Sequence, residues 1–168
     1  MKLIQIDKAR YRKHLNYVIV SCIVALVVGS LGIAQALIAL FPDASGSHFH
    51  WNLTGVVVSA IGIGFILNKY RRHPFMTEVT YVWELKQVLN KINRKLTKIK
   101  NEAQKGDVKA MQILHYSYAG SRLLWRLDDN SIVMDELSLA QNELDVLADK
   151  YHVPLSAEVF DVAELNNY

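Results

Sequence analysis

The hydrophobic pattern divides the chain into an apolar first part and a charged second part. The 25 residues of Tyr17–Phe41 contain no Asp, Glu, Lys, Arg or His, and fourteen of them are Leu, Ile, Val or Phe. A helix rises about 1.5 Å per residue, so about 20 apolar residues cover a hydrocarbon core of about 30 Å. The pattern therefore predicts a transmembrane helix over residues 17–41.

A second apolar segment follows closely and is more dilute. Leu53–Leu67 holds nine Leu, Ile, Val or Phe residues, interspersed with glycine and hydroxyl side chains. Trp51 precedes this segment and Tyr70 follows it. Aromatic residues of this kind are typical of the two interfaces of a membrane. We expect a second transmembrane helix over residues 52–68, with a buried helix of a soluble domain as the alternative.

Lysine and arginine residues lie outside this pair of segments and are missing between them. Five occur within residues 1–16 and three within residues 69–72, whereas residues 42–51 hold none. Cationic loops mark the cytoplasmic side of a membrane. We therefore expect a basic juxtamembrane segment over residues 1–16, a periplasmic loop over residues 42–51 and both chain ends in the cytoplasm. A signal peptide cleaved near Ala34-Gln35-Ala36 is the alternative, but the apolar run is longer than such a peptide requires.

Small side chains recur at helical spacing along both predicted spans. In lipid, helices associate where small residues let their backbones approach. Gln35 is the one strongly polar side chain of the first span. It is interpreted as forming a hydrogen bond between helices, with the lining of a pore as the alternative. The small residues of the two spans suit an antiparallel hairpin and a homo-oligomer equally well. The candidate helix-packing residues are Gly29, Gly32, Gln35, Gly55, Ser59 and Gly62.

The charged part, residues 74–168, shows the three-four spacing of amphipathic helices. An apolar seam from Val82 to Ile99 predicts a first helix. Gly106-Asp107 has the residue types of a helix stop followed by an N-cap, so a second helix is expected from about Val108 to Leu127. A third helix is expected to begin near Met134, where acidic residues suit a helix N-terminus.

The sequence thus predicts an all-α protein in which a two-helix transmembrane hairpin precedes a small cytoplasmic three-helix domain. Beyond Pro154 the pattern supports only one or two turns around Val159–Leu165. Charge is unevenly distributed along this domain. Residues 86–109 hold eight bases and two acids, and residues 128–168 hold ten acids and one base.

These opposite charges favour the first and third helices of the domain as neighbours. The other interpretation is that the basic face contacts anionic lipid or an acidic partner, since each cation near a membrane surface contributes about 1 kcal/mol. Nucleic-acid binding is not expected, because this face has almost no aromatic or polar side chains that could read bases. The cations that carry these interpretations are Lys91, Arg94, Lys95 and Lys98.

Motifs for catalysis and for cofactor binding are missing from the sequence. There is no nucleotide-binding loop, zinc motif, nucleophile elbow or kinase signature, so no cofactor is expected. Cys22 is the only cysteine and is interpreted as a small side chain that faces lipid or a helix. His48 and His50 with Asp43 make a weak metal site, for which a plain polar loop is the favoured interpretation. The acids of Asp128-Asp129-Asn130 are interpreted as a helix break.

Several short stretches of the sequence resemble a known family. The stretches are Met1–Ile4, Arg10–Asn16, Phe49–Leu53, His73–Val79, Gly120–Arg122 and Leu127–Asn130. They resemble, nearly from end to end, the short bacterial membrane proteins grouped as domain of unknown function 3087. The resemblance implies a bacterial inner membrane protein of this layout. It carries over no activity, cofactor or catalytic residue.

The leading interpretation is a non-enzymatic protein of the bacterial inner membrane. Its two spans would anchor a helical module whose cytoplasmic helices meet a protein partner or a second copy, and membrane lipids would be further partners. The alternative is a small oligomeric channel or transport accessory that uses Gln35 and the glycine faces. An enzyme at the membrane ranks last, because no catalytic constellation supports it.

Overall fold

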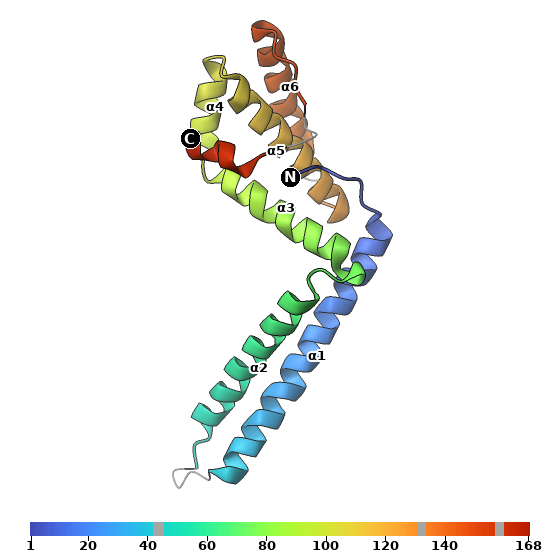
Figure 1. Cartoon of the computed structure of the whole chain (residues 1–168), viewed down its shortest axis with the longest axis vertical. Helices are drawn as coiled ribbons and strands as arrows, with labels where there is room; N and C mark the ends of the chain where they lie inside the picture. Colours follow the sequence, from blue (N-terminus) through green and yellow to red (C-terminus); the bar gives the residue numbers. More distant parts are fainter. Residues whose placement is uncertain (42–45, 131–133, 157–159) are drawn as a thin grey trace. The chain divides into compact units, whose positions relative to one another are not determined.

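The computed structural model describes residues 1–41, 46–130, 134–156 and 160–168. Within these ranges the regular elements are all helices, which confirms the predicted all-α fold (Figure 1). The elements are α1 (Lys8–Leu40), α2 (Phe49–Tyr70), η1 (Pro74–Met76), α3 (Thr77–Asn93), α4 (Leu96–Gln104), α5 (Val108–Leu127), α6 (Met134–Tyr151) and η2 (Val162–Asn167). The predicted loop of residues 42–51 lies partly outside the described residues.

The chain divides into two compact units, and the division falls within α3. One unit comprises Ala9–Thr80, and the other comprises Met1–Lys8 together with Tyr81–Tyr168. We call the first the hairpin unit and the second the helical unit. The sequence pattern alone does not associate the first eight residues with the end of the chain.

In the hairpin unit, α1 and α2 run antiparallel and side by side (Figure 1). Both helices are long and apolar enough to cross a membrane. Their apolar side chains point outward, since Phe65 is 72% exposed and Val28 is 65% exposed. Large exposed apolar surfaces are rare in soluble proteins, so this pair of helices suggests association with a membrane.

Both long helices extend beyond the apolar segments that predict them. α1 begins at Lys8, so residues 8–16 of the predicted basic segment belong to the same helix as the predicted span. α2 exceeds the predicted range of residues 52–68 at both ends. Hydropathy identifies the residues that suit lipid, whereas the helix itself continues for as long as the flanking residues permit.

In the helical unit, α5 occupies the centre of the core. It contributes ten buried residues, and α4 and α6 both pack against it. Gly120 allows a close approach of α3, because a Cβ atom at this position would lie 3.2 Å from Leu89 Cδ2. The sequence spacing predicts α5 and α6 well, since α5 spans the expected range and α6 begins at the expected Met134.

The seam from Val82 to Ile99 is divided between α3 and α4, so the helical unit has four described α-helices where the spacing predicts three. The chain turns at Arg94 and Lys95, where the Lys95 amide donates to the Ile92 carbonyl at 2.9 Å, a bond of three-residue span. This turn redirects α4 so that its apolar face, including Ile99, packs against α5. The three-four spacing persists across the turn, which is why the pattern reads as one helix.

The junction between α4 and α5 confirms the predicted stop and cap. Gly106 has a φ of +96°, which favours glycine, and the Asp107 amide donates to the Glu102 carbonyl at 3.1 Å. The Asp107 carboxylate then accepts hydrogen bonds from the amides of Lys109 and Ala110. Local residue chemistry therefore fixes this turn.

The start and the end of the chain pack together on the helical unit (Figure 1). The Phe160 amide donates to the Met1 carbonyl at 3.0 Å, and the Phe160 ring stacks on Tyr116 with centroids 4.8 Å apart. The Tyr81 hydroxyl accepts from the Ile4 amide and donates to the Lys2 carbonyl. The predicted turn around Val159–Leu165 corresponds in part to η2, and Val159 lies outside the described residues.

Candidate functional site

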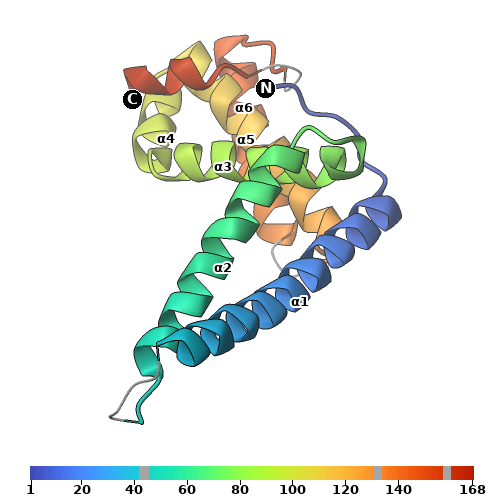
Figure 2. The same cartoon turned by 60° about the horizontal axis from the view of Figure 1, so that its bottom comes forward.

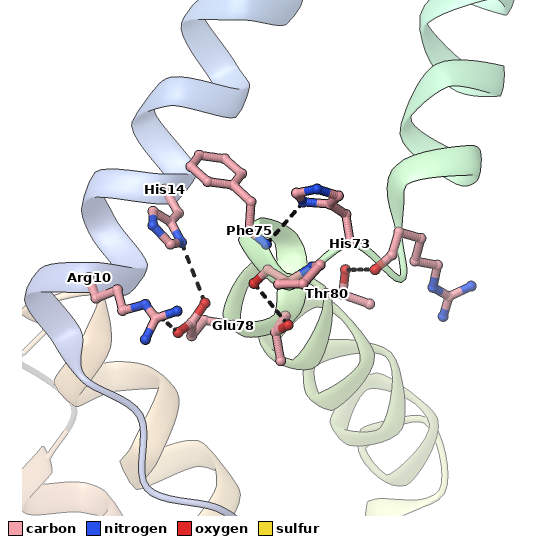
Figure 3. Close-up of polar contacts among 9 residues, drawn as sticks. Arg10, His14, His73, Phe75, Glu78 and Thr80 are labelled. Atoms are coloured by element: carbon pink, nitrogen blue, oxygen red, sulfur yellow. Dashed lines mark hydrogen bonds and ion pairs between the residues drawn. The ribbon is translucent and has the colours of Figure 1, made fainter.

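A partly buried acidic side chain organises one end of the hairpin unit. Glu78 lies in the first turn of α3, and its side chain is only 16% exposed (Figure 3). Arg10 Nε of α1 lies 2.9 Å from Glu78 Oε1 in an ion pair, and His14 Nδ1 lies 3.4 Å from Glu78 Oε2. The second distance lacks hydrogen-bond geometry, since both of its atoms have no hydrogen bond among the described residues, and it is an ion pair only when His14 is protonated. One carboxylate thus faces two bases of α1.

The turn after α2 holds this acid in place. Pro74 opens η1, and the His73 side chain caps it by accepting a hydrogen bond from the Phe75 amide at 3.2 Å. The Phe75 ring stacks on His14 with centroids 4.1 Å apart (Figure 3). Thr80 Oγ1 donates to the Arg71 carbonyl at 3.0 Å, which ties the start of α3 back to the end of α2.

Beside this cluster lies an apolar groove of about 390 Å³ between α1 and α2. Figure 2 shows that the two helices diverge toward the end where α1 begins and α2 ends. Phe75 and His73 line the groove at that end. The other lining residues are Tyr17, Val18, Ser21, Cys22 and Ala25 from α1, Ile63, Ile66, Leu67 and Tyr70 from α2, and Met76.

The structure brings some of the predicted packing residues together. A Cβ atom at Gly29 would lie 2.9 Å from Ser59 Oγ, and one at Gly55 would lie 2.4 Å from the Ser30 carbonyl oxygen. Gly32 and Gly62 face open space instead, with no described atom within 4 Å of a Cβ position.

Gln35 is exposed, and its side chain makes no hydrogen bond to any described residue. It therefore lies on the outer surface of the hairpin and not between its two helices. The neighbouring Ala34 is buried and approaches Gly55 in its place.

The four predicted basic residues fall into two pairs. Lys95 Nζ donates to the Leu165 carbonyl and Lys98 Nζ donates to the Tyr168 carbonyl, each at 2.7 Å. Lys91 and Arg94 are exposed, and they pair with no described side chain. None of the four forms an ion pair with an acid in the described part of α6, which packs against α5. The expected pairing of basic and acidic helices is therefore not found.

Acidic residues after α5 also have lysine partners. Lys86 Nζ lies 3.2 Å from Asp128 Oδ2, and Lys8 pairs with Asp129. Within the described ranges, no group of three or more His, Cys, Asp or Glu side chains is arranged to hold a metal ion. The Asp128 and Asp129 carboxylates are used in ion pairs.

A second polar cluster joins α5 to α6, and the sequence gives no signal for it. The Gln141 amide bridges His115 Nδ1 at 3.0 Å and Asp145 Oδ1 at 2.8 Å. Burial lowers the pKa of His115, the Asp145 charge raises it in part, and Arg122 lowers it. The three side chains come from two helices, so their meeting depends on how α6 packs against α5.

The fold and charges define an all-α protein with two helices apolar enough to cross a membrane and a separate helical unit. The family model described as protein of unknown function (DUF3087) matches residues 1–165. The chain therefore belongs to this family. Neither the curated proteins nor the solved structures contain a match to it.

Proposed function

We propose that this protein is a two-span protein of the bacterial inner membrane that presents its helical unit to a partner in the cytoplasm. α1 and α2 cross the bilayer as a hairpin, and both chain ends stay on the cytoplasmic side. The protein has no catalytic role in this proposal. It acts as a membrane-anchored interaction module.

The observation that carries the proposal is the outward apolar surface of α1 and α2 together with the placement of charge. Both helices expose most of their apolar side chains, which lipid would cover. Residues 9–80 contain six Lys or Arg, all at the same end of the hairpin, and two acids, Asp43 and Glu78. Cations at one end of a helical hairpin favour a cytoplasmic location for that end.

The partner surface that fits best is the outer face of α6. Leu139 and Val146 are 65% and 71% exposed and lie seven residues apart, so they share one side of the helix. Exposed acids, Glu136 and Glu143, flank them on this side. A partner with apolar side chains bordered by cations would complement this surface.

The exposed cations Lys91 and Arg94 support a second contact, with anionic lipid or an acidic protein segment. Lys95 and Lys98 are engaged with the end of the chain and contribute less to such a contact. The channel alternative gains no support from the exposed position of Gln35. Ion flux through vesicles that contain the protein would favour it.

Site-specific photo-crosslinking in native membranes tests the interaction module. A photoreactive amino acid at Leu139 or Val146 is expected to capture one defined protein. The same amino acid at Thr97, an exposed residue of α4, is the matched control. Equal capture at all three positions, or capture of lipid alone, would contradict a partner surface on α6.

A further inference from the structure

The groove between α1 and α2 has the dimensions and the lining of a lipid site. We propose that it holds an acyl chain of an anionic phospholipid from the cytoplasmic leaflet, with the phosphate beside Lys13 and Lys69. This assignment rests on the membrane insertion proposed above. It adds a specific ligand class to the general contact between a membrane protein and its lipids.

The length of the groove matches one leaflet. Its lining on α1 runs from Tyr17 to Ala25, and the eight steps between these residues cover about 12 Å along a helix. Half of a hydrocarbon core of about 30 Å is about 15 Å. A groove that reaches from the cytoplasmic end of the hairpin to this depth fits a chain of the inner leaflet.

The lining leaves room that the protein does not fill. Ser21 and Ala25 put small side chains on the α1 wall, opposite the branched side chains of Ile63 and Ile66. Farther along, the helices touch through Gly29 and its contact with α2. Side chains that line an unfilled apolar volume lose dispersion contacts. A flexible acyl chain would restore these contacts without burying a polar group.

Charge at the open end of the groove suits an anionic headgroup. Lys13 lies one helical turn before Tyr17 on α1, and Lys69 lies three residues after Ile66 on α2. Both lysines are exposed, and neither pairs with a described side chain. Among the described residues of the hairpin unit the one acid is Glu78, and it already faces Arg10 and His14, so it would not repel a phosphate.

The test measures lipid retained by the full chain after purification in mild detergent. Native mass spectrometry of protein from vesicles of phosphatidylglycerol and phosphatidylethanolamine is expected to show one retained phospholipid, enriched in phosphatidylglycerol. Ala25→Trp fills the groove and is expected to abolish retention. Val24→Trp places the same ring on the outer face of α1, where Val24 is 55% exposed, and is expected to keep the lipid. Lys13→Gln with Lys69→Gln should remove the preference for phosphatidylglycerol.

Loss of lipid from both tryptophan variants to the same extent, or from neither, would overturn the proposal. A photoreactive phosphatidylglycerol provides a measurement on the unaltered chain, and adducts are expected on groove residues of α1 and α2. Adducts spread evenly over the outer faces would contradict a defined site.

Cys22 lines the groove and is the only cysteine, so a Cys22–Cys22 crosslink between chains would show a second copy there instead. Resistance of the chain to alkaline extraction from membranes, measured in parallel, separates failure of the lipid site from failure of membrane insertion.

Discussion

At the scale of single residues, Tyr116 is a buried polar group in the core of the helical unit. Its side chain is 1% exposed, and its hydroxyl has no hydrogen-bond partner among the described residues. Burial raises the pKa of Tyr116 to about 12, with a smaller contribution from Tyr81. The folded protein therefore favours the neutral phenol.

Tyr116→Phe is expected to leave the free energy of unfolding unchanged at neutral pH or to raise it by about 1 kcal/mol, because it removes an unpaired buried hydroxyl. In the unaltered protein, the raised pKa of Tyr116 couples its ionisation to unfolding. The free energy of unfolding is therefore at its full value below pH 10.0 and falls as the pH rises toward about 12. The variant should lose less stability over this range. Thermal unfolding of the full chain in detergent measures both effects, with Tyr70→Phe as the exposed control. A variant that is less stable at neutral pH would show that the hydroxyl has a partner.

Glu78 is the residue on which the polar contacts of the hairpin unit converge. Glu78→Gln keeps the shape of the side chain and removes the charge that faces Arg10 and His14. The expected loss is about 1–3 kcal/mol of unfolding free energy, because the Glu78 carboxylate is only 16% exposed, although the Arg10 side chain that pairs with it is 58% exposed. Glu102→Gln is the matched control, since Glu102 pairs with Lys105 on the surface and such pairs are worth about 0–1 kcal/mol. Equal effects of the two variants in a thermal unfolding assay would argue against a structural role for Glu78.

At the scale of elements, the contact between α1 and α2 depends on glycine at one position and not at another. Gly55→Ala would place a Cβ atom 2.4 Å from the Ser30 carbonyl oxygen, so the helices must shift. Overpacking of this kind costs about 1–3 kcal/mol. Gly62→Ala meets no described atom within 4 Å and should be neutral. Thermal unfolding in detergent compares the two, and a neutral Gly55→Ala would mean that the helices do not pack in this way.

The basic residues of α3 and α4 are expected to differ in their effect on stability. Lys95→Gln with Lys98→Gln removes two hydrogen bonds to the end of the chain and should lower the unfolding free energy by about 1–2 kcal/mol. Lys91→Gln with Arg94→Gln should change it by less than about 0.5 kcal/mol. Limited proteolysis near Tyr168 is expected to cleave the Lys95→Gln, Lys98→Gln variant faster than the Lys91→Gln, Arg94→Gln variant. Similar protection in both double variants would contradict an anchoring role for Lys95 and Lys98.

The local sequence predicts most of the helices well. It does not predict contacts between residues that lie far apart in the chain. The sequence locates the start of α5 because Gly106 and Asp107 are the residue types of a helix stop and an N-cap, and both act within the turn itself. It misses the turn between α3 and α4 because the same apolar spacing continues on both sides. The pairing of Phe160 with Met1 joins residues at opposite ends of the chain, and no periodicity reports it.

At the scale of the whole molecule, the pattern of apolar residues predicts which helices pack together better than the pattern of charges does. The acidic helix α6 packs against α5 through Leu137 and Leu144, although its charge complements the basic face of α3 and α4. Surface ion pairs are worth at most about 1 kcal/mol, so apolar contacts decide the packing. The Glu78 cluster is likewise invisible in the sequence, because Arg10 and His14 are more than sixty residues away from it in the chain.

In the proposed topology, α1 and α2 cross a membrane and return the chain to the cytoplasm. Paired topology reporters test it most directly: alkaline phosphatase, which is active only in the periplasm, and green fluorescent protein, which fluoresces only in the cytoplasm. Each reporter is fused after Tyr168 and, separately, inserted at Ser45 in the predicted loop. We predict fluorescence without phosphatase activity at Tyr168 and phosphatase activity without fluorescence at Ser45. Reports from the same compartment at both positions would contradict the two-span hairpin.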